Sequence, residues 1–164
     1  MQCLIVDNQM RRLENSQIAF IEAGMQVTGS GSGRVTEACL RRSIVDVLVV
    51  DHDTVGARVT DVIRMAESRN PSLVTIVLTS KVEDDLAAFE EEFSSLHAVM
   101  GSEVAPVMLS KMALSWAVQG ALMPKSSIEP MRVKREEVTQ TPVFSTARRT
   151  EEPVAEPEVA REAA

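Results

Sequence analysis

Two carboxylates stand at the end of the most apolar stretch of the chain. Val47 to Val50 are apolar and mostly β-branched, and they lead directly into Asp51, His52 and Asp53. Such a run predicts a buried strand that delivers both carboxylates to one end of a sheet. Carboxylates in that place can bind a metal ion, attack a phosphoryl group, or merely end the strand in a polar loop.

Polar side chains follow two further apolar stretches in the same way. Residues 3–6 lead into Asp7 and Asn8, and residues 73–78 lead into Thr79. If these strands are parallel, their carboxyl ends meet at one edge of the sheet, where ligands bind. Carboxylates from neighbouring strands repel each other unless a cation such as Mg²⁺ lies between them. The cluster therefore suits aspartyl phosphate chemistry, in which the hydroxyl of Thr79 or Ser80 would bond a phosphoryl oxygen.

Strand and helix patterns alternate through residues 1–120. Short apolar runs predict strands at residues 3–6, 25–27, 47–50, 73–78 and 97–100. Helical spacing of apolar residues predicts helices at 10–23, 35–42, 57–68, 81–93 and 106–119. The side chains expected to face the core include Leu13, Ile18, Phe20 and Ile21, then Val35, Ala38 and Cys39, and later Leu86, Phe89 and Phe93. This alternation predicts an α/β fold with a doubly wound five-stranded parallel sheet.

Composition excludes several classes of function. The chain of 164 residues has a net charge of −7 and no basic stripe, which argues against a nucleic-acid binder. Arg11 and Arg12, like Arg41 and Arg42, are predicted to lie on solvated helix faces. No apolar run reaches the roughly 20 residues that span a bilayer, and no apolar leader opens the sequence, so we expect a cytoplasmic protein without membrane insertion. Both cysteines are expected to be reduced thiols.

The last part of the chain differs from the rest. Residues 122–164 contain five of the seven prolines and a mixture of seven Lys or Arg with eight Glu, without a sustained helix or strand period. Such a segment cannot bury enough apolar surface to offset its chain entropy. We therefore expect a folded domain over residues 1–121 and a disordered charged tail over 122–164.

Three motifs stand in a familiar order. "LIVDN" contains Asp7, "VLVVDHDTVG" contains Asp51 with Gly56 five residues later, and "IVLTS" contains Thr79. In this order and spacing, residues 1–120 resemble the receiver domain of bacterial two-component response regulators, a CheY-like domain. The resemblance implies a flavodoxin-like (βα)5 fold.

The resemblance also implies a stand-alone receiver in two-component signal transduction. Asp51 would accept a phosphoryl group from a sensor histidine kinase or a phosphotransfer protein, and the protein would then signal through a further protein partner. Mg²⁺ would be held by Asp7, Asp51 and the backbone carbonyl of Asp53, and Thr79 would supply the switch hydroxyl. Such a protein is a phosphoryl acceptor and not an enzyme.

The sequence departs from the family pattern at three places. Asn8 replaces the second acid of the acidic pair, and no lysine lies between residues 82 and 110, where the family has one at the end of strand five. Lys81, two residues after Thr79, is a candidate substitute for that phosphate contact. The aromatic switch residue is also missing, with His97 or Val99 near its place.

Two alternatives remain open. A pseudo-receiver would use the same fold as an interaction module without phosphorylation, which the missing lysine favours. The Asp51–His52–Asp53 triplet also resembles the D-x-D motif of haloacid-dehalogenase-type phosphatases, although that motif normally follows the first strand of its fold. The glycine-alternating segment 29–33 lacks the spacing of a nucleotide-binding motif and is predicted to be a flexible loop.

Overall fold

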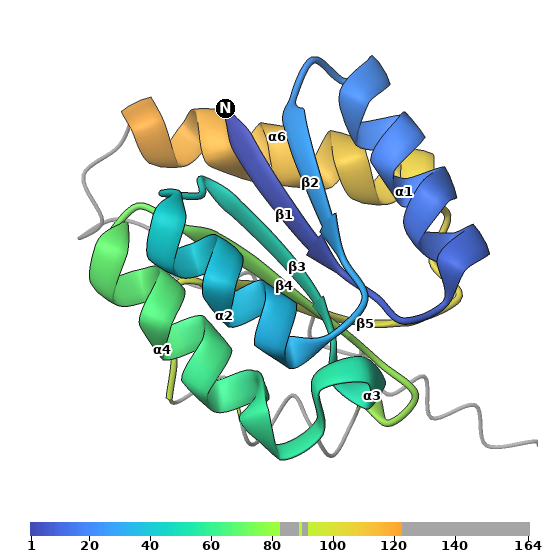
Figure 1. Cartoon of the computed structure of the whole chain (residues 1–164). Helices are drawn as coiled ribbons and strands as arrows, with labels where there is room; N and C mark the ends of the chain where they lie inside the picture. Colours follow the sequence, from blue (N-terminus) through green and yellow to red (C-terminus); the bar gives the residue numbers. More distant parts are fainter. Residues whose placement is uncertain (83–88, 90–91, 123–164) are drawn as a thin grey trace, which may run out of the picture. The chain divides into compact units, whose positions relative to one another are not determined.

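A parallel sheet with helices on both faces forms the described part of the chain. The structure, a computed structural model, describes residues 1–82, 89 and 92–122 (Figure 1). The strands, in the spatial order β2-β1-β3-β4-β5 and all parallel, are β1 (Gln2–Val6), β2 (Gln26–Ser30), β3 (Val47–Asp51), β4 (Val74–Thr79) and β5 (Leu96–Gly101). The helices are α1 (Met10–Glu22), α2 (Gly33–Arg42), α3 (His52–Val55), the 3-10 turn η1 (Gly56–Arg58), α4 (Val59–Arg69) and α6 (Pro106–Leu122). The predicted five-stranded doubly wound fold is confirmed.

Alternate side chains of each strand enter two separate apolar cores, because successive residues of a strand point to opposite faces. Leu4 and Val6 of β1 pack in the core beneath α2 and α4, whereas Cys3 and Ile5 pack in the core beneath α1 and α6. Figure 1 shows these helix pairs on opposite faces of the sheet. The strand order reverses between β1 and β3, which is where ligands bind in open α/β sheets.

Four apolar residues that were expected in the core are exposed, and Ala38 of α2 is one of them. Ile18 and Ile21 on α1 are 55% and 58% exposed, and Val35 on α2 is 51% exposed. The buried stripe of α1 instead consists of Leu13, Ser16, Ala19 and Phe20, and that of α2 consists of Thr36 and Leu40. Small or hydroxyl-bearing residues in these stripes let the helices lie close to the sheet, which apolar periodicity alone does not reveal.

The connections after β2 and β3 differ from the prediction. The strand β2 continues to Ser30 and α2 begins at Gly33, so most of the predicted glycine loop belongs to regular elements. The helix α3 begins immediately after β3, whereas the next helix was predicted to begin only at residue 57. Gly56, with φ +59°, then turns the chain into η1 and α4.

Two predicted segments fall largely outside the residues that the structure describes. Within the predicted helix 81–93, Phe89 and Phe93 are buried as expected, and Leu86 lies outside the described residues. The predicted tail lies outside them except for Leu122, so the domain boundary at residue 121 stays a prediction. Both cysteines are free thiols.

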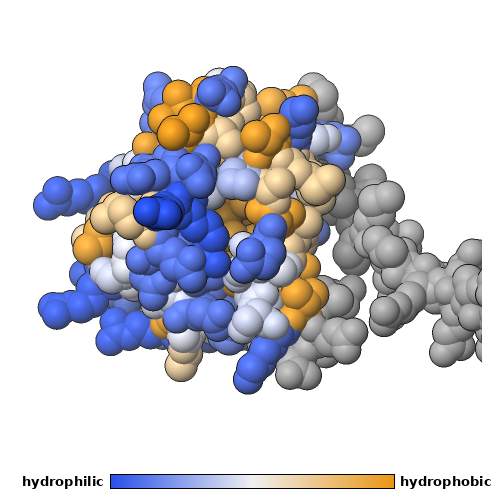
Figure 2. Space-filling view, turned by 90° about the vertical axis from the view of Figure 1, so that its right-hand side faces the viewer, coloured by the Kyte–Doolittle hydropathy of each residue, from blue (hydrophilic) through white to orange (hydrophobic). Residues whose placement is uncertain are grey.

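The surface is mainly hydrophilic on the side where α1 lies. Figure 2 shows its apolar area as separate patches among hydrophilic residues. In the part of the chain that the structure describes, no helix is both long and apolar enough to cross a bilayer.

Candidate functional site

The predicted acidic and hydroxyl groups meet at the carboxyl edge of the sheet. Asp7 directly follows β1, Asp51 is the last residue of β3 and Thr79 is the last residue of β4. All three are buried, with exposed fractions of 2%, 1% and 1%. Parallel pairing of the central strands explains this convergence across more than seventy residues of sequence.

Arg12 joins the two carboxylates. Its Nη2 atom lies 3.0 Å from Asp7 Oδ1 and 2.8 Å from Asp51 Oδ1, and its Nε atom donates a hydrogen bond to Asp7 Oδ2. The side chain is only 19% exposed. The prediction of a solvated face therefore holds for Arg11, which is exposed, but is wrong for Arg12. The third residue of α1 faces the strand ends because the helix starts directly above them.

The surrounding charges keep Arg12 protonated. A hydrogen bond from Arg12 to Asp7 is the largest cause that raises the pKa of the guanidinium, and the negative charges of Asp51, Asp7 and Glu103 raise it further. Burial acts in the opposite direction but is outweighed. A permanent cation therefore lies between the two carboxylates, where the sequence led us to expect Mg²⁺.

Both carboxylate oxygens of Asp51 have partners. Ser102 Oγ donates a hydrogen bond to Oδ1 over 3.3 Å, on the same oxygen that contacts Arg12. The other oxygen, Oδ2, accepts from the Thr54 backbone N–H at 2.9 Å and from Thr54 Oγ1 at 2.6 Å. Asp51 thus caps the amino end of α3. A carboxylate engaged in this way must lose donors before either oxygen can attack a phosphoryl group.

Thr54 and Ser102 were missed at the sequence level. Aspartate is a preferred helix N-cap that accepts from a backbone N–H two or three residues later, so Asp51 contained a usable signal for its contact with the Thr54 N–H, but not for its contact with the Thr54 hydroxyl. Ser102 had no such signal, because its contact with Asp51 depends on where β5 ends. It directly follows β5, the position where the family resemblance leads one to expect a lysine.

The remaining predicted site residues lie at the margin of this cluster. Asn8 is exposed, and its backbone N–H donates to Thr54 Oγ1 over 2.9 Å. Asp53 is exposed on α3, whereas Asp51 is buried. Lys81 is also exposed, and it reaches Thr79 through its backbone N–H, which donates to Thr79 Oγ1 over 3.0 Å. Their proposed roles toward a metal or a phosphoryl group stay predictions.

The side chains do not form a magnesium site as they are arranged. Mg²⁺ requires oxygen ligands in octahedral geometry, and a guanidinium between the carboxylates competes for the same charge and space. Among the residues that the structure describes, no group of three or more His, Cys, Asp or Glu side chains could hold a metal ion. At this edge of the sheet Arg12 instead bridges the carboxylates of Asp7 and Asp51, which we call the acid pair.

No protein-family model matches this sequence, and no curated protein matches it either. A response regulator receiver domain from Clostridium thermocellum superposes with a TM-score of 0.62 at 18% identity, covering 74% of this chain and 97% of its own. A CheY-like receiver from Methanospirillum hungatei JF-1 gives 0.63 at 15% identity, covering 74% and 96%. The chain has the receiver-domain fold.

A third structure with a similar fold comes from a regulator described as atypical. It is an atypical orphan response regulator described as revealing a phosphorylation-independent regulatory mechanism, and it superposes with a TM-score of 0.60 at 12% identity. The match covers 72% of this chain and 96% of that protein. In receiver terms, the first acid after strand one (Asp7), the strand-three aspartate and the strand-four hydroxyl are present here, and Asn8 replaces the second acid. Arginine and serine side chains contact the strand-three aspartate.

Proposed function

We propose that this chain is a receiver-fold signalling protein that works through protein–protein contacts without phosphoryl transfer to Asp51. The ion pair between Arg12 and Asp51 is the observation that carries this proposal. The guanidinium supplies the positive charge that a receiver otherwise obtains from a metal ion. The protein is thus an interaction module and not an enzyme.

Chemistry at Asp51 would be costly in this arrangement. An attacking oxygen must give up either the Arg12 and Ser102 contacts or the two Thr54 hydrogen bonds. A phosphoryl group would then add a charge of about −1.5 to −2 beside Asp7, with a single guanidinium to oppose it. In the proposed function, Asp51 instead has a structural role, because its contacts connect α1, α3 and the segment after β5.

A second candidate is the phosphorylated receiver. It is favoured by the burial of Asp7, Asp51 and Thr79 at one edge of the sheet. In that candidate, Arg12 leaves the acid pair, Mg²⁺ binds to Asp7, Asp51 and the Asp53 carbonyl, and a histidine kinase or phosphotransfer protein is the donor. The phosphatase alternative has less support, because the D-x-D segment follows the third strand and its two acids differ in burial.

Mass spectrometry after incubation with acetyl phosphate and Mg²⁺ distinguishes these candidates. The proposal expects no phosphoryl adduct on the full chain, under conditions in which a known receiver is modified. An adduct that disappears in Asp51→Asn would overturn it in favour of the phosphorylated receiver. Steady hydrolysis of phosphate esters that depends on Asp53 would instead indicate the phosphatase.

A further inference from the structure

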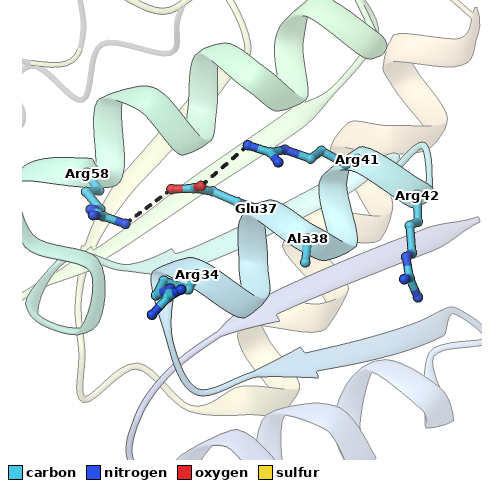
Figure 3. Close-up of a pocket in the computed structure, with 6 residues that line it drawn as sticks. All are labelled: Arg34, Glu37, Ala38, Arg41, Arg42 and Arg58. Atoms are coloured by element: carbon cyan, nitrogen blue, oxygen red, sulfur yellow. Dashed lines mark ion pairs between the residues drawn. The ribbon is translucent and has the colours of Figure 1, made fainter.

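Four arginines surround a hollow on the surface of α2 and η1. The hollow is lined by Arg34, Glu37, Ala38, Arg41, Arg42 and Arg58, and we call it the arginine hollow (Figure 3). Its residues are not among those that contact Asp7 or Asp51. All four arginines are exposed.

Helix geometry produces the hollow. Arg34, Ala38 and Arg41 lie at positions i, i+4 and i+7 of α2, so they share one face of the helix. The small side chain of Ala38 leaves space between the arginines. Arg58 enters from η1, and its stem lies beside Gly33, where an added Cβ would be 3.9 Å from Arg58 Cδ.

Among the described lining residues, a single carboxylate opposes these four charges. Glu37 Oε1 lies 3.5 Å from Arg58 Nη1, and Glu37 Oε2 lies 4.0 Å from Arg41 Nη2. Dashed lines mark both ion pairs in Figure 3. Such long, exposed ion pairs are weak and exchange readily with another anion. Within the described ranges, Arg34 and Arg42 form no ion pair. The hollow is therefore locally positive in a chain whose net charge is −7.

The stability of α2 does not explain this arrangement. The amino end of a helix is positive, so carboxylates are favoured in its first turn and cations are disfavoured. Here the first turn contains Arg34 and no acidic residue, and Arg58 lies close by. Arg41 and Arg42 do suit the carboxyl end of α2, but Arg34 and Arg58 weaken the other end.

We infer that the arginine hollow binds a carboxylate-rich, extended segment of a partner protein. From Arg34 to Arg42 the helix rises about 12 Å, which an extended peptide of about four residues spans. Guanidinium groups bond carboxylates through two parallel hydrogen bonds. Glu37 shows that a carboxylate can lie between two of these arginines.

Other anions fit the hollow less well. Among the residues that the structure describes, no aromatic ring lines it, so these residues offer a nucleobase nothing to stack on. A nucleic-acid backbone would extend well beyond the hollow and meet the negative charge of the rest of the chain. At about 0.1 M salt, charges more than about 10 Å apart are largely screened. A short acidic segment in the hollow would therefore interact mainly with the arginines and little with the rest of the chain.

The inference rests on the proposed function in that it names the contact surface of the interaction module. Its test uses the full chain and a fluorescein-labelled short peptide that alternates Glu and Gly, with a Gln–Gly peptide as the neutral control. Fluorescence anisotropy is measured at about 0.15 M salt, where long-range attraction is screened. The Glu–Gly peptide is expected to bind and the Gln–Gly peptide is not.

Charge reversal identifies the surface. Arg34→Glu and Arg58→Glu are each expected to weaken peptide binding by about tenfold or more. Arg11→Glu, on α1 and outside the hollow, is the matched control and should bind like the unchanged protein. Arg34→Glu places a carboxylate in the first turn of α2, where it is favoured, so this variant is expected to fold.

Three outcomes would overturn the inference: no binding of the Glu–Gly peptide, an equal loss in Arg11→Glu, or tighter binding of a DNA duplex or pyrophosphate than of the peptide. None of them depends on Asp51. A phosphoryl adduct on Asp51 would overturn the proposed function and leave the peptide result unchanged, so the two failures are distinguishable.

Discussion

Arg12 Nη2 lies 2.8 Å from Asp51 Oδ1, and the same guanidinium hydrogen-bonds to Asp7. Two buried carboxylates from neighbouring strands are thereby held around one cation that belongs to the chain itself. Because the cation is part of α1, the helix and the strand ends are connected without an added ion.

Replacing Arg12 should expose a divalent cation site. In Arg12→Gln the two carboxylates lose their counter-charge, and removing one partner of a buried ion pair costs about 3 kcal/mol of unfolding free energy. Mg²⁺ should then raise the melting temperature of Arg12→Gln and leave that of the unchanged protein where it is. Thermal unfolding by circular dichroism, with Mg²⁺ and with a chelator, measures both effects.

Arg11→Gln is the matched control for that experiment, because Arg11 is the exposed neighbour on the same helix. It should unfold like the unchanged protein and show no response to Mg²⁺. Equal stabilisation of the unchanged protein by Mg²⁺ would show that the ion binds beside Arg12 and does not compete with it.

The Thr54 hydroxyl should stabilise the site. It donates to Asp51 Oδ2 and accepts the Asn8 N–H, so Thr54→Val breaks both hydrogen bonds without changing the shape of the side chain. We expect a loss of about 1–2 kcal/mol in urea unfolding, since a buried carboxylate then lacks a donor. Thr54→Ser should keep most of the stability, and Thr60→Val on α4 should change little. Equal losses in Thr54→Val and Thr54→Ser would point to packing instead.

Adding a side chain at Gly56 should lower the stability of the fold. Its φ of +59° is disfavoured for residues with a Cβ, so Gly56→Ala should lower stability by about 1–2 kcal/mol. Gly120 lies in the helix α6, where nothing crowds an added Cβ, and Gly120→Ala should raise stability by up to about 1 kcal/mol. The two melting temperatures should shift in opposite directions. A shift of the same sign would refute the backbone explanation.

The two cysteines should differ in reactivity. Cys3 is 1% exposed in the core, and burial raises the pKa of its thiol, so almost no reactive thiolate forms near pH 8. Cys39 is only half-buried. Under native conditions, a disulfide reagent should modify the Cys3→Ser variant at its remaining thiol, Cys39. It should leave Cys3 of the Cys39→Ser variant unmodified until that variant unfolds. Rapid reaction of native Cys39→Ser would contradict the burial of Cys3.

Local patterns predicted the sheet and the positions of Asp7, Asp51 and Thr79. Apolar runs such as residues 47–50 are bounded by polar residues, and parallel strands must bring their ends to one edge. The same patterns misplaced Ile18 and Val35, because helical spacing shows which residues are apolar but not which face packs. In α2 the buried positions are taken by Thr36 and Leu40.

By itself, the sequence determined the α/β class, the strand ends and the acidic and hydroxyl groups at them, since these depend on local periodicity and on the rules of parallel sheets. Only the tertiary structure decided what those groups contact. Arg12, Thr54 and Ser102 come from three different segments, and their meeting at Asp51 depends on how α1, α3 and the segment after β5 are placed on the sheet. The arginine hollow has the same origin, because Arg58 joins the charges of α2 only after the chain has folded.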